Sequence, residues 1–194
     1  LIQEVAKTAE HLTVFQRSPN WCAPLHNGPI DPTGMADIRS RYDEIFGRCR
    51  KSFSGFIHDS DERRALDVSE EEREALYEEL YAAPGFGIWI GNFRDVLVDE
   101  AANATLSDFI ARKIRERVED KELAEKLIPR DHGFGTRRVP METSYYGIYN
   151  QDNVLLVDVN ETPIEKDTTD GIHCSDQEHP FDLIFYATGF NAVI

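Results

Sequence analysis

Two groups of arginine residues have neighbours that suit the binding of an anion. The first is Arg17 with Ser18, which directly follows an apolar run, Leu12 to Phe15, typical of a buried strand. In a dinucleotide-binding βαβ unit, an acid just past the second strand binds the ribose 2′-hydroxyl, whereas Arg beside a small hydroxyl residue accommodates a 2′-phosphate. No acid occurs in this turn, so the pattern favours NADP over NAD. A solvated arginine at a strand end remains the alternative.

Arg137 and Arg138 form the second group, in a run from Gly135 to Pro140. Two adjacent guanidinium groups repel each other unless an anion or carboxylates lie between or beyond them. In an acidic chain, a pair of surface salt bridges explains them as well as a bound anion does. The flanking Gly and Pro favour a fixed loop, which is where anion-binding arginines are usually held.

Two glycine-containing segments are candidates for further binding elements. Gly189 follows Thr188 after an expected strand, and a glycine there permits close approach of the backbone to a ligand or to another segment. The run Gly85 to Gly91 resembles a dinucleotide fingerprint, but its last spacing is one residue too long and it follows a helical pattern rather than a strand. We therefore interpret that run as a turn between helices with packed aromatic residues.

Other kinds of catalytic site find no support in the sequence. The three cysteines, Cys22, Cys49 and Cys174, are widely spaced, and the six histidines show no His-x-x-x-His spacing. We therefore expect no metal site and no disulfide framework, which suits the reducing cytoplasm. No Gly-x-Ser-x-Gly motif is present, so nucleophilic catalysis by serine or cysteine is not indicated.

The elements that would hold these residues change character twice along the chain. Apolar residues at helical spacing predict an opening helix through Ala9, and the strand at 12–15 then completes the second half of a βαβ unit. Charged amphipathic helices are expected over most of 32–130. One of them starts at a capping box, Ser69 with Glu72. This order predicts an α/β fold interrupted by a helical insertion.

Strands return after this helical part. They are expected over residues 154–157, 164–168, 171–174 and 183–187. Asp170-Gly171 suits a hairpin turn between two of them. The first residue lies within an expected helix and the last expected strand ends close to the last residue, so we expect the sequence to be a fragment of a larger protein.

Composition excludes several classes of partner. The chain has 36 Asp and Glu against 21 Lys and Arg in 194 residues, a formal charge of −15. This charge disfavours nucleic acid and anionic lipid, and no apolar run is long enough to span a bilayer. The acidic runs, such as Glu70 to Glu72, are typical of solvated helix faces, with a partner-binding surface as the alternative.

Several of these segments together resemble the Baeyer–Villiger branch of the flavin-dependent monooxygenases. The match runs in order along essentially the whole chain and is less sharp in the helical middle. The segments that carry it are Leu12 to Trp21, Phe134 to Arg138, Tyr145 to Asn150, Asp152 to Glu165 and Ala187 to Phe190.

The resemblance implies an enzyme with an FAD domain and an NADP domain, the latter a Rossmann-like fold with a helical insertion. This sequence would then supply most of the NADP domain. Residues 1–31 would be its truncated start, 32–130 the helical insertion, and 131–194 the return to the domain and the beginning of the link to the FAD domain.

The resemblance also implies roles for particular residues. Arg17 and Ser18 would hold the 2′-phosphate, as would Arg137, which stands where the family usually has Lys. Arg138 matches the active-site arginine that stabilises the anionic flavin peroxide. Thr188 and Gly189 would lie at the cofactor.

The implied reaction uses NADPH, FAD and O2 to insert one oxygen atom beside a ketone carbonyl, giving an ester or lactone. Parts of both phosphate-binding sites are absent from the sequence, so the isolated chain is expected to be inactive and to bind neither cofactor tightly. Two alternatives remain open: a related enzyme that oxidises nitrogen or sulfur, and a catalytically inactive helical interaction module.

Overall fold

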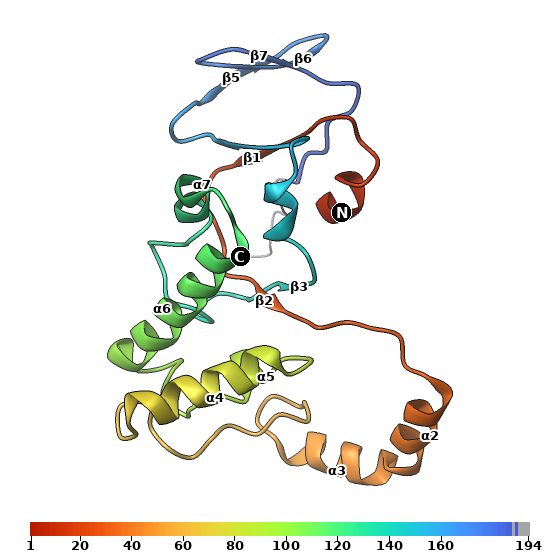
Figure 1. Ribbon diagram of the computed structural model, residues 1–194, viewed down its shortest axis with the longest axis vertical. Coiled ribbons are helices and arrows are strands. Elements are labelled where there is room, and N and C mark those ends of the chain that lie inside the picture. The colour runs from red at the N-terminus through yellow and green to blue at the C-terminus, as the bar shows by residue number, and fades with distance from the viewer. Residues whose placement is uncertain (188, 190–194) are drawn as a thin grey trace.

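The computed structural model describes residues 1–187 and 189, and the chain is elongated, with strands at one end and helices at the other (Figure 1). Both ends of the sequence contribute to the strand-rich end. There β1 (Leu12–Gln16) pairs in parallel with β4 (Val154–Asp158), in a register that places Leu12 opposite Val154. The expected strands at 12–15 and 154–157 are therefore present, and the intervening chain forms most of the helices. The mixture of helices and parallel strands confirms the α/β class.

The opening helix is shorter than the sequence indicates. Helix α1 covers only Ile2–Val5, and the chain then turns before β1. The side-chain amide of Asn153 donates hydrogen bonds of 3.0 Å to the carbonyls of both Ala6 and Ala9. Because Asn153 directly precedes β4, these bonds tie the end of α1 to the sheet rather than letting the helix continue to Ala9.

A second, antiparallel sheet follows β4 in the chain. It consists of β5 (Ile164–Asp167), β6 (Gly171–Cys174) and β7 (Glu178–Pro180), in that order. The expected hairpin between the first two strands is present, and β7 was not expected. Gly171 is required at its position because a Cβ there would lie 1.9 Å from the carbonyl oxygen of His179.

The helical part contains six α-helices in the described residues. Two short strands, β2 and β3, and the 3-10 helix η1 accompany them. The bounds are α2 Pro32–Ser40, α3 Tyr42–Lys51, α4 Glu70–Ala82, α5 Gly87–Ile90, α6 Glu100–Arg117, α7 Lys121–Lys126, β2 Ala23–Pro24, β3 Met141–Glu142 and η1 Gly147–Asn150.

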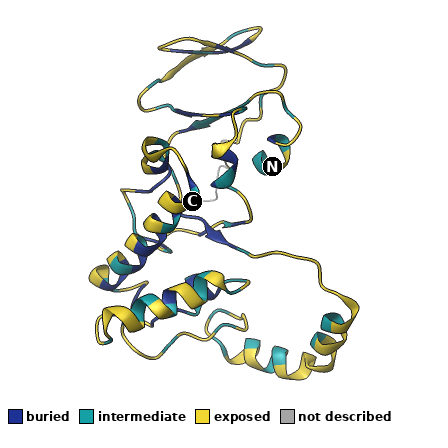
Figure 2. Ribbon diagram, viewed as in Figure 1, coloured by how far each residue is buried: buried dark blue, intermediate teal, exposed yellow. Residues whose placement is uncertain are grey.

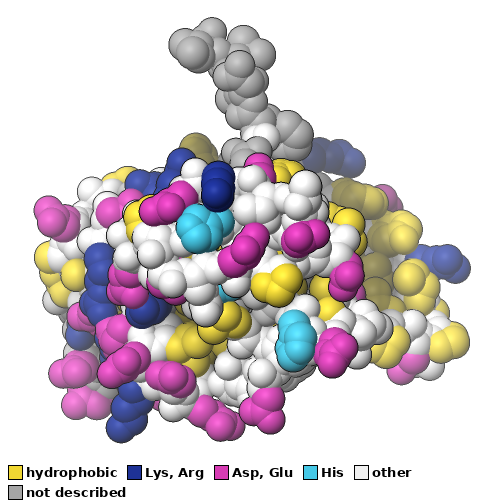
Figure 3. All heavy atoms as spheres, turned by 90° about the horizontal axis from the view of Figure 1, so that it is seen from above, with side chains coloured by type: hydrophobic (Ala, Val, Ile, Leu, Met, Phe, Trp, Pro, Cys, Tyr) yellow, Lys and Arg dark blue, Asp and Glu magenta, His cyan; other side chains and the backbone are white. Residues whose placement is uncertain are grey.

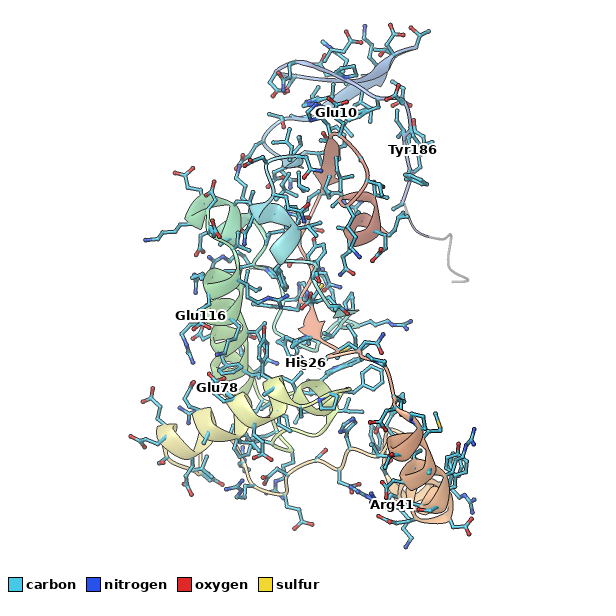
Figure 4. All side chains as sticks on the ribbon, turned by 45° about the vertical axis from the view of Figure 1, so that its right-hand side comes forward. Glu10, His26, Arg41, Glu78, Glu116 and Tyr186 are labelled. Carbon is cyan, nitrogen blue, oxygen red and sulfur yellow. The ribbon has the colours of Figure 1, made fainter. Side chains whose placement is uncertain are left out.

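Helices α4 and α6 pack against each other through buried aromatic side chains. Helix α4 begins at the expected capping box, in which the side chains of Ser69 and Glu72 each accept a backbone N–H from the other residue. Tyr77 of α4 packs against Phe109 of α6, with ring centroids 5.4 Å apart, and both side chains are fully buried. Lys113 of α6 forms an ion pair with Glu78 of α4, with 2.6 Å between Nζ and the carboxylate oxygen. Figure 4 shows Glu78 and Glu116 close together at this edge of the two helices.

The first two helices of this part are poorly packed by comparison. Figure 2 shows no buried residue in α2 or α3, whereas α6 has a continuous buried stripe. Even the large apolar side chains of Tyr42 and Phe46 in α3 are exposed. These helices therefore add little to the core of the chain.

The strand expected at 183–187 is not formed. Leu183, Phe185 and Tyr186 are 69%, 58% and 66% exposed, and no described strand pairs with the segment. A strand needs a partner for its backbone groups, and the apolar pattern alone does not supply one. Figure 4 shows Tyr186 on this outlying segment. Among the described residues, no helix is long and apolar enough to cross a membrane.

Candidate functional site

The two arginine-bearing loops predicted from the sequence lie against each other. Asn20, three residues after Arg17, donates a 3.1 Å hydrogen bond from Nδ2 to the backbone carbonyl of Arg138, across 118 residues of sequence. The indole nitrogen of the next residue, Trp21, donates to the carbonyl of His132 at 2.9 Å. The same two loops then continue into the parallel bridge between β2 and β3. The fold therefore brings the two arginine-bearing loops into direct contact.

His132, in the loop that carries Arg137 and Arg138, contacts side chains of both loops. Its Nδ1 lies 2.6 Å from Oδ1 of Asp131, and its Nε2 lies 3.2 Å from Oδ1 of Asn20. Because Nδ2 of Asn20 is committed to the carbonyl of Arg138, its Oδ1 must be the atom that faces the imidazole. One histidine thus joins the loop after β1 to the loop that carries Arg137 and Arg138.

The predicted arginines differ in what they contact. Arg137 donates from Nη2 to Oδ2 of Asp131 at 2.9 Å, so it already has a carboxylate partner. Hydrogen bonding from His132 and the charge of Arg137 together lower the pKa of Asp131. The side chains of Arg17 and Arg138 are exposed and form no ion pair with any described residue. Arg17 and Arg138 are therefore the two that have guanidinium groups available for an anion.

Hydrogen bonds fix the backbone at Arg17, although its side chain forms no ion pair with a described residue. The carbonyl of Arg17 accepts a 2.5 Å hydrogen bond from Nδ2 of Asn160, in the turn after β4. The carbonyl of the preceding Gln16 accepts from the N–H of Val159. Ser18 is exposed beside it. The site that sequence reasoning placed at the end of β1 is thus a fixed turn with outward side chains.

Two side chains of α6 that the sequence analysis did not identify form hydrogen bonds to the loop that carries Arg137 and Arg138. Asn103, 8% exposed, donates to the carbonyls of Val96 and Phe134 at 2.7 and 2.8 Å. Ser107 donates to Oδ1 of Asn103 and accepts the N–H of Phe134 at 2.9 Å. A Cβ on Gly133 would lie 1.8 Å from Oδ1 of Asn103, so only glycine allows this approach.

Replacing Asn103 with alanine should destabilise the chain by about 2 kcal/mol, because two buried carbonyl groups lose their donor. Urea unfolding of the purified chain measures this change. Asn27→Ala is the matched control, since Asn27 is exposed in a loop. A loss below about 0.5 kcal/mol for Asn103→Ala, within the range of ordinary surface substitutions, would contradict the role assigned to this side chain.

A buried ion pair connects α6 to β3 near the same junction. Arg117 makes two hydrogen bonds to the carboxylate of Glu142, at 2.5 and 3.1 Å, and Glu142 is buried. Burial is the largest single influence and opposes the charge of Arg117, but the hydrogen bond to Glu142, the charge of Glu142 and the contact with Tyr81 together outweigh it and raise the pKa of Arg117. Burial, with the charge of Glu142, raises the pKa of the nearby Cys22 to about 12, so that thiol stays protonated and unreactive.

A groove of about 540 Å³ opens beside the loop, on the side of α6. Trp21, Arg115, Arg130, His132 and Thr136 contribute to its wall, together with other residues of α6 and the loop. Arg17, Arg137 and Arg138 do not line it. In the described part of the chain, the groove and the predicted anion-binding arginines therefore lie at different places.

The glycine run at 85–91 packs against the side chain of His58. It leads into the short helix α5, as a turn between helices, and Phe86 packs against Phe56 with ring centroids 4.8 Å apart. Nε2 of His58 accepts the N–H of Phe86 at 3.1 Å, and a Cβ on Gly85 would lie 3.0 Å from that nitrogen. Burial lowers the pKa of His58, which favours the neutral ring that can accept this bond.

Of the predicted cofactor-binding residues Thr188 and Gly189, only Gly189 is among the described residues. Thr188 lies outside the described residues. Gly189 has a φ of +88°, a backbone conformation that favours glycine, and no described atom lies within 4 Å of the position a Cβ would take. The structure therefore does not bring Gly189 to the junction of the two arginine loops.

Comparison with known proteins gives the relatives of this chain. No family model matches it. It is 51% identical over 193 residues to 2-oxo-Δ3-4,5,5-trimethylcyclopentenylacetyl-CoA monooxygenase of Pseudomonas putida, covering 100% of this chain and 35% of that protein. It is 42% identical to cyclopentanone 1,2-monooxygenase of a Comamonas species, covering 98% of this chain and 35% of that protein.

Solved structures agree with these relatives. A crystal structure of OTEMO in complex with FAD and NADP superposes with a TM-score of 0.96 at 51% identity, covering 99% of this chain and 36% of that one. The open crystal structure of cyclohexanone monooxygenase gives a TM-score of 0.93 at 38% identity, covering 99% of this chain and 38% of that one.

The fold and these relatives therefore identify the chain as similar to a segment of the flavoprotein monooxygenases. Within that class, the chain belongs to the Baeyer–Villiger monooxygenases and spans about a third of the length of the relatives it matches.

Proposed function

We propose that this chain is the NADP-binding part of an FAD- and NADPH-dependent monooxygenase that inserts one oxygen atom of O2 beside a ketone carbonyl. The observation that carries the proposal is the junction of the two arginine loops through Asn20 and His132. It presents the side chains of Arg17 and Arg138 from neighbouring loops. The names of the relatives support the substrate class, since cyclopentanone and cyclohexanone monooxygenases are among them.

The residues present fit a cofactor that carries a 2′-phosphate. Arg17 is exposed, forms no ion pair with a described residue, and stands on a fixed turn beside the hydroxyl of Ser18. A free guanidinium next to a hydroxyl is suited to bind a phosphate dianion through several donors. We assign Arg17 and Ser18 to the 2′-phosphate, with Arg137 as an additional positive charge that Asp131 holds in place.

Arg138 is assigned to the reacting centre. FAD, when bound, supplies the activation of O2 and the transfer of one oxygen atom. The guanidinium group of Arg138 is a cationic donor that can stabilise negative charge developing during that transfer. Asn20 positions the backbone of Arg138 through its carbonyl, and leaves the guanidinium free to turn toward a ligand.

We divide the chain as 1–31 and 131–194 for the NADP-binding part and 32–130 for a helical insertion. The pairing of β1 with β4 supports this division, because it joins the first and last of these segments directly. We assign Thr188 and Gly189 to the cofactor side on the family resemblance of their sequence alone. The free thiols of Cys22, Cys49 and Cys174 support a cytoplasmic location.

Oxidation of nitrogen is the second candidate function. The chain is 38% identical to phenazine N-monooxygenase PhzNO1 of Lysobacter antibioticus over 190 residues, which is the same identity as to one Baeyer–Villiger monooxygenase. Sequence identity at this level therefore does not separate the two reactions. Product analysis with a ketone and with an aromatic amine separates them.

A chimera tests the proposed function. Residues 1–194 would replace the matching third of the 51%-identical Pseudomonas putida enzyme, which supplies the remaining segments. We expect the FAD-loaded chimera to oxidise NADPH and to convert cyclopentanone to its lactone. A folded, FAD-loaded chimera that consumes NADPH but forms only an N-oxide would favour the second candidate, and one that oxidises no substrate would contradict both.

Replacing Arg17 with alanine in this chimera should lower the preference for NADPH over NADH by about 10- to 100-fold, the value of one or two charged hydrogen bonds to phosphate. The ratio of kcat/KM for the two cofactors measures the effect. Arg39→Ala is the matched control, because Arg39 is an exposed arginine on α2. An unchanged ratio in Arg17→Ala would place the 2′-phosphate elsewhere.

A further inference from the structure

The antiparallel sheet at the strand-rich end brings three potential metal ligands together. One ligand atom each from Cys174, Asp176 and His179 lies within 4.8 Å of the others. The register explains this: His179 of β7 pairs with Ile172 of β6, and Cys174 stands two residues further along β6, on the same face. The spacing of Cys and His in the sequence predicts no metal site, because this neighbourhood arises only when the hairpin forms.

Two of the three side chains are buried, and one of them lacks a partner. Cys174 is fully buried and His179 is 6% exposed. Nε2 of His179 is buried and has no hydrogen-bond partner among the described residues. A buried polar atom without a partner costs about 1–3 kcal/mol, and such an atom in a native fold calls for an explanation such as a missing ion.

The imidazole of His179 is held in a fixed orientation. Phe15 of β1 meets it edge-on, with ring centroids 5.5 Å apart, and Phe181 stacks parallel to it at 6.3 Å. These contacts also connect β7 to the parallel sheet. A ring held in this way has lost its rotamer freedom before a ligand arrives, which favours binding.

The donor set suits a thiophilic divalent cation. Thiolate, imidazole and carboxylate are the usual ligands of Zn²⁺, and bond lengths of about 2.0–2.3 Å place tetrahedral ligand atoms roughly 3.5 Å apart. The cluster must therefore close by about 1 Å from its present separation of up to 4.8 Å. Asp176 is exposed in the turn between β6 and β7 and is free to make that adjustment.

The surroundings are acidic, which also favours a cation. The three strands and their turns carry Glu165, Asp167, Asp170, Asp176 and Glu178. Figure 3, which looks onto this end of the molecule, shows Asp and Glu side chains spread over the face. Their charges attract a divalent cation to the hairpin before it is bound.

We propose that Cys174, Asp176 and His179 form a binding site for a Zn²⁺-like divalent cation, with water as the fourth ligand. On binding, the Cys174 sulfur loses its proton to solvent and forms a bond to the metal, without any change of oxidation state. The cation joins β6 to β7 and, through the fixed ring of His179, to β1. The site is independent of the proposed oxygenation reaction.

Titration of the 194-residue chain with Co²⁺ as a spectroscopic substitute tests the proposal. We expect one equivalent to give tetrahedral d–d bands in the visible and a thiolate-to-cobalt charge-transfer band in the near ultraviolet. Zn²⁺ should abolish both and raise the Tm of the chain. Cys174→Ser should remove the charge-transfer band, and Cys49→Ser, which changes a thiol on α3, is the matched control and should leave it intact.

Two further variants separate ligation from folding. His179→Phe preserves an aromatic ring between Phe15 and Phe181 but removes the nitrogen, and Asp176→Asn changes an exposed residue. Each should weaken Co²⁺ binding by at least 10- to 100-fold, the loss typical of a disturbed ligand shell. Absence of a charge-transfer band at millimolar Co²⁺, or its persistence in Cys174→Ser, would overturn the proposal. So would unchanged affinity in both His179→Phe and Asp176→Asn.

Discussion

Replacing Arg138 with alanine in the chimera should lower the rate of ester or lactone formation by about 10²–10³-fold, which is the usual effect of removing one preorganised donor from a developing anion. The structure supplies the reason for this choice of residue. Arg138 has an exposed guanidinium without an ion-pair partner among the described residues, whereas Arg137 is already paired with Asp131. A guanidinium that no neighbouring carboxylate neutralises is available to stabilise a bound anion.

The reduction of FAD by NADPH should change much less than product formation. NADPH binding is assigned to Arg17 and Ser18 on the other loop, with Arg137 as an additional charge, and the Arg138→Ala variant leaves all three side chains in place. Anaerobic reduction of the flavin and the yield of product per NADPH, measured on the same preparation, report the two steps separately. Arg138→Ala should therefore consume NADPH with little product.

Two matched variants control for general effects of charge and packing. Arg138→Lys keeps the charge but loses the planar fork, so it should recover only part of the activity. Arg130→Ala removes an exposed arginine that pairs with Glu125 in the same segment of chain, and product formation should stay near that of the parent chimera. Product formation within a few-fold of the parent in Arg138→Ala would exclude this residue as the stabiliser of the developing charge.

Local signals predicted the elements that depend on local physics. The Ser69–Glu72 capping box starts α4 at the expected residue, and the β-branched run after residue 11 forms β1. The arginine groups were also recognisable from residue type and from the Gly and Pro around them. For such features, the determining interactions are made within a few residues of sequence.

Long-range contacts determine the features that the sequence did not predict, and no local sequence pattern reveals these contacts. Asn20 reaches the carbonyl of Arg138 across 118 residues, and nothing in either segment specifies that pairing. Asn153 binds the carbonyls of Ala6 and Ala9, in the segment between the end of α1 and β1. The segment 183–187 has the composition of a strand but no described partner, so it remains without strand structure. The cluster at Cys174 likewise requires the register of β6 against β7.

Replacing Glu142 with alanine should cost about 3–5 kcal/mol of stability, because it leaves a largely buried arginine charge without its partner. The carboxylate of Glu142 accepts two hydrogen bonds from Arg117 and one from the N–H of Tyr145, at 2.7 Å. Arg117 also lies over the ring of Tyr146, 5.2 Å from its centroid. Loss of the carboxylate therefore affects α6, β3 and the tyrosines before η1 together.

Urea unfolding of the 194-residue chain measures this loss, and a double variant tests its cause. If the cost comes from the unpaired charge, Arg117→Met combined with Glu142→Leu should be markedly more stable than Glu142→Ala alone, since hydrophobic replacement of a buried pair is often tolerated. Lys7→Met with Glu4→Leu is the control, because that pair is exposed and should contribute less than about 1 kcal/mol. A double variant at 117 and 142 no more stable than Glu142→Ala would show that the carboxylate acts mainly through Tyr145. A loss below about 1 kcal/mol in Glu142→Ala would show that the pair contributes no more than a surface one.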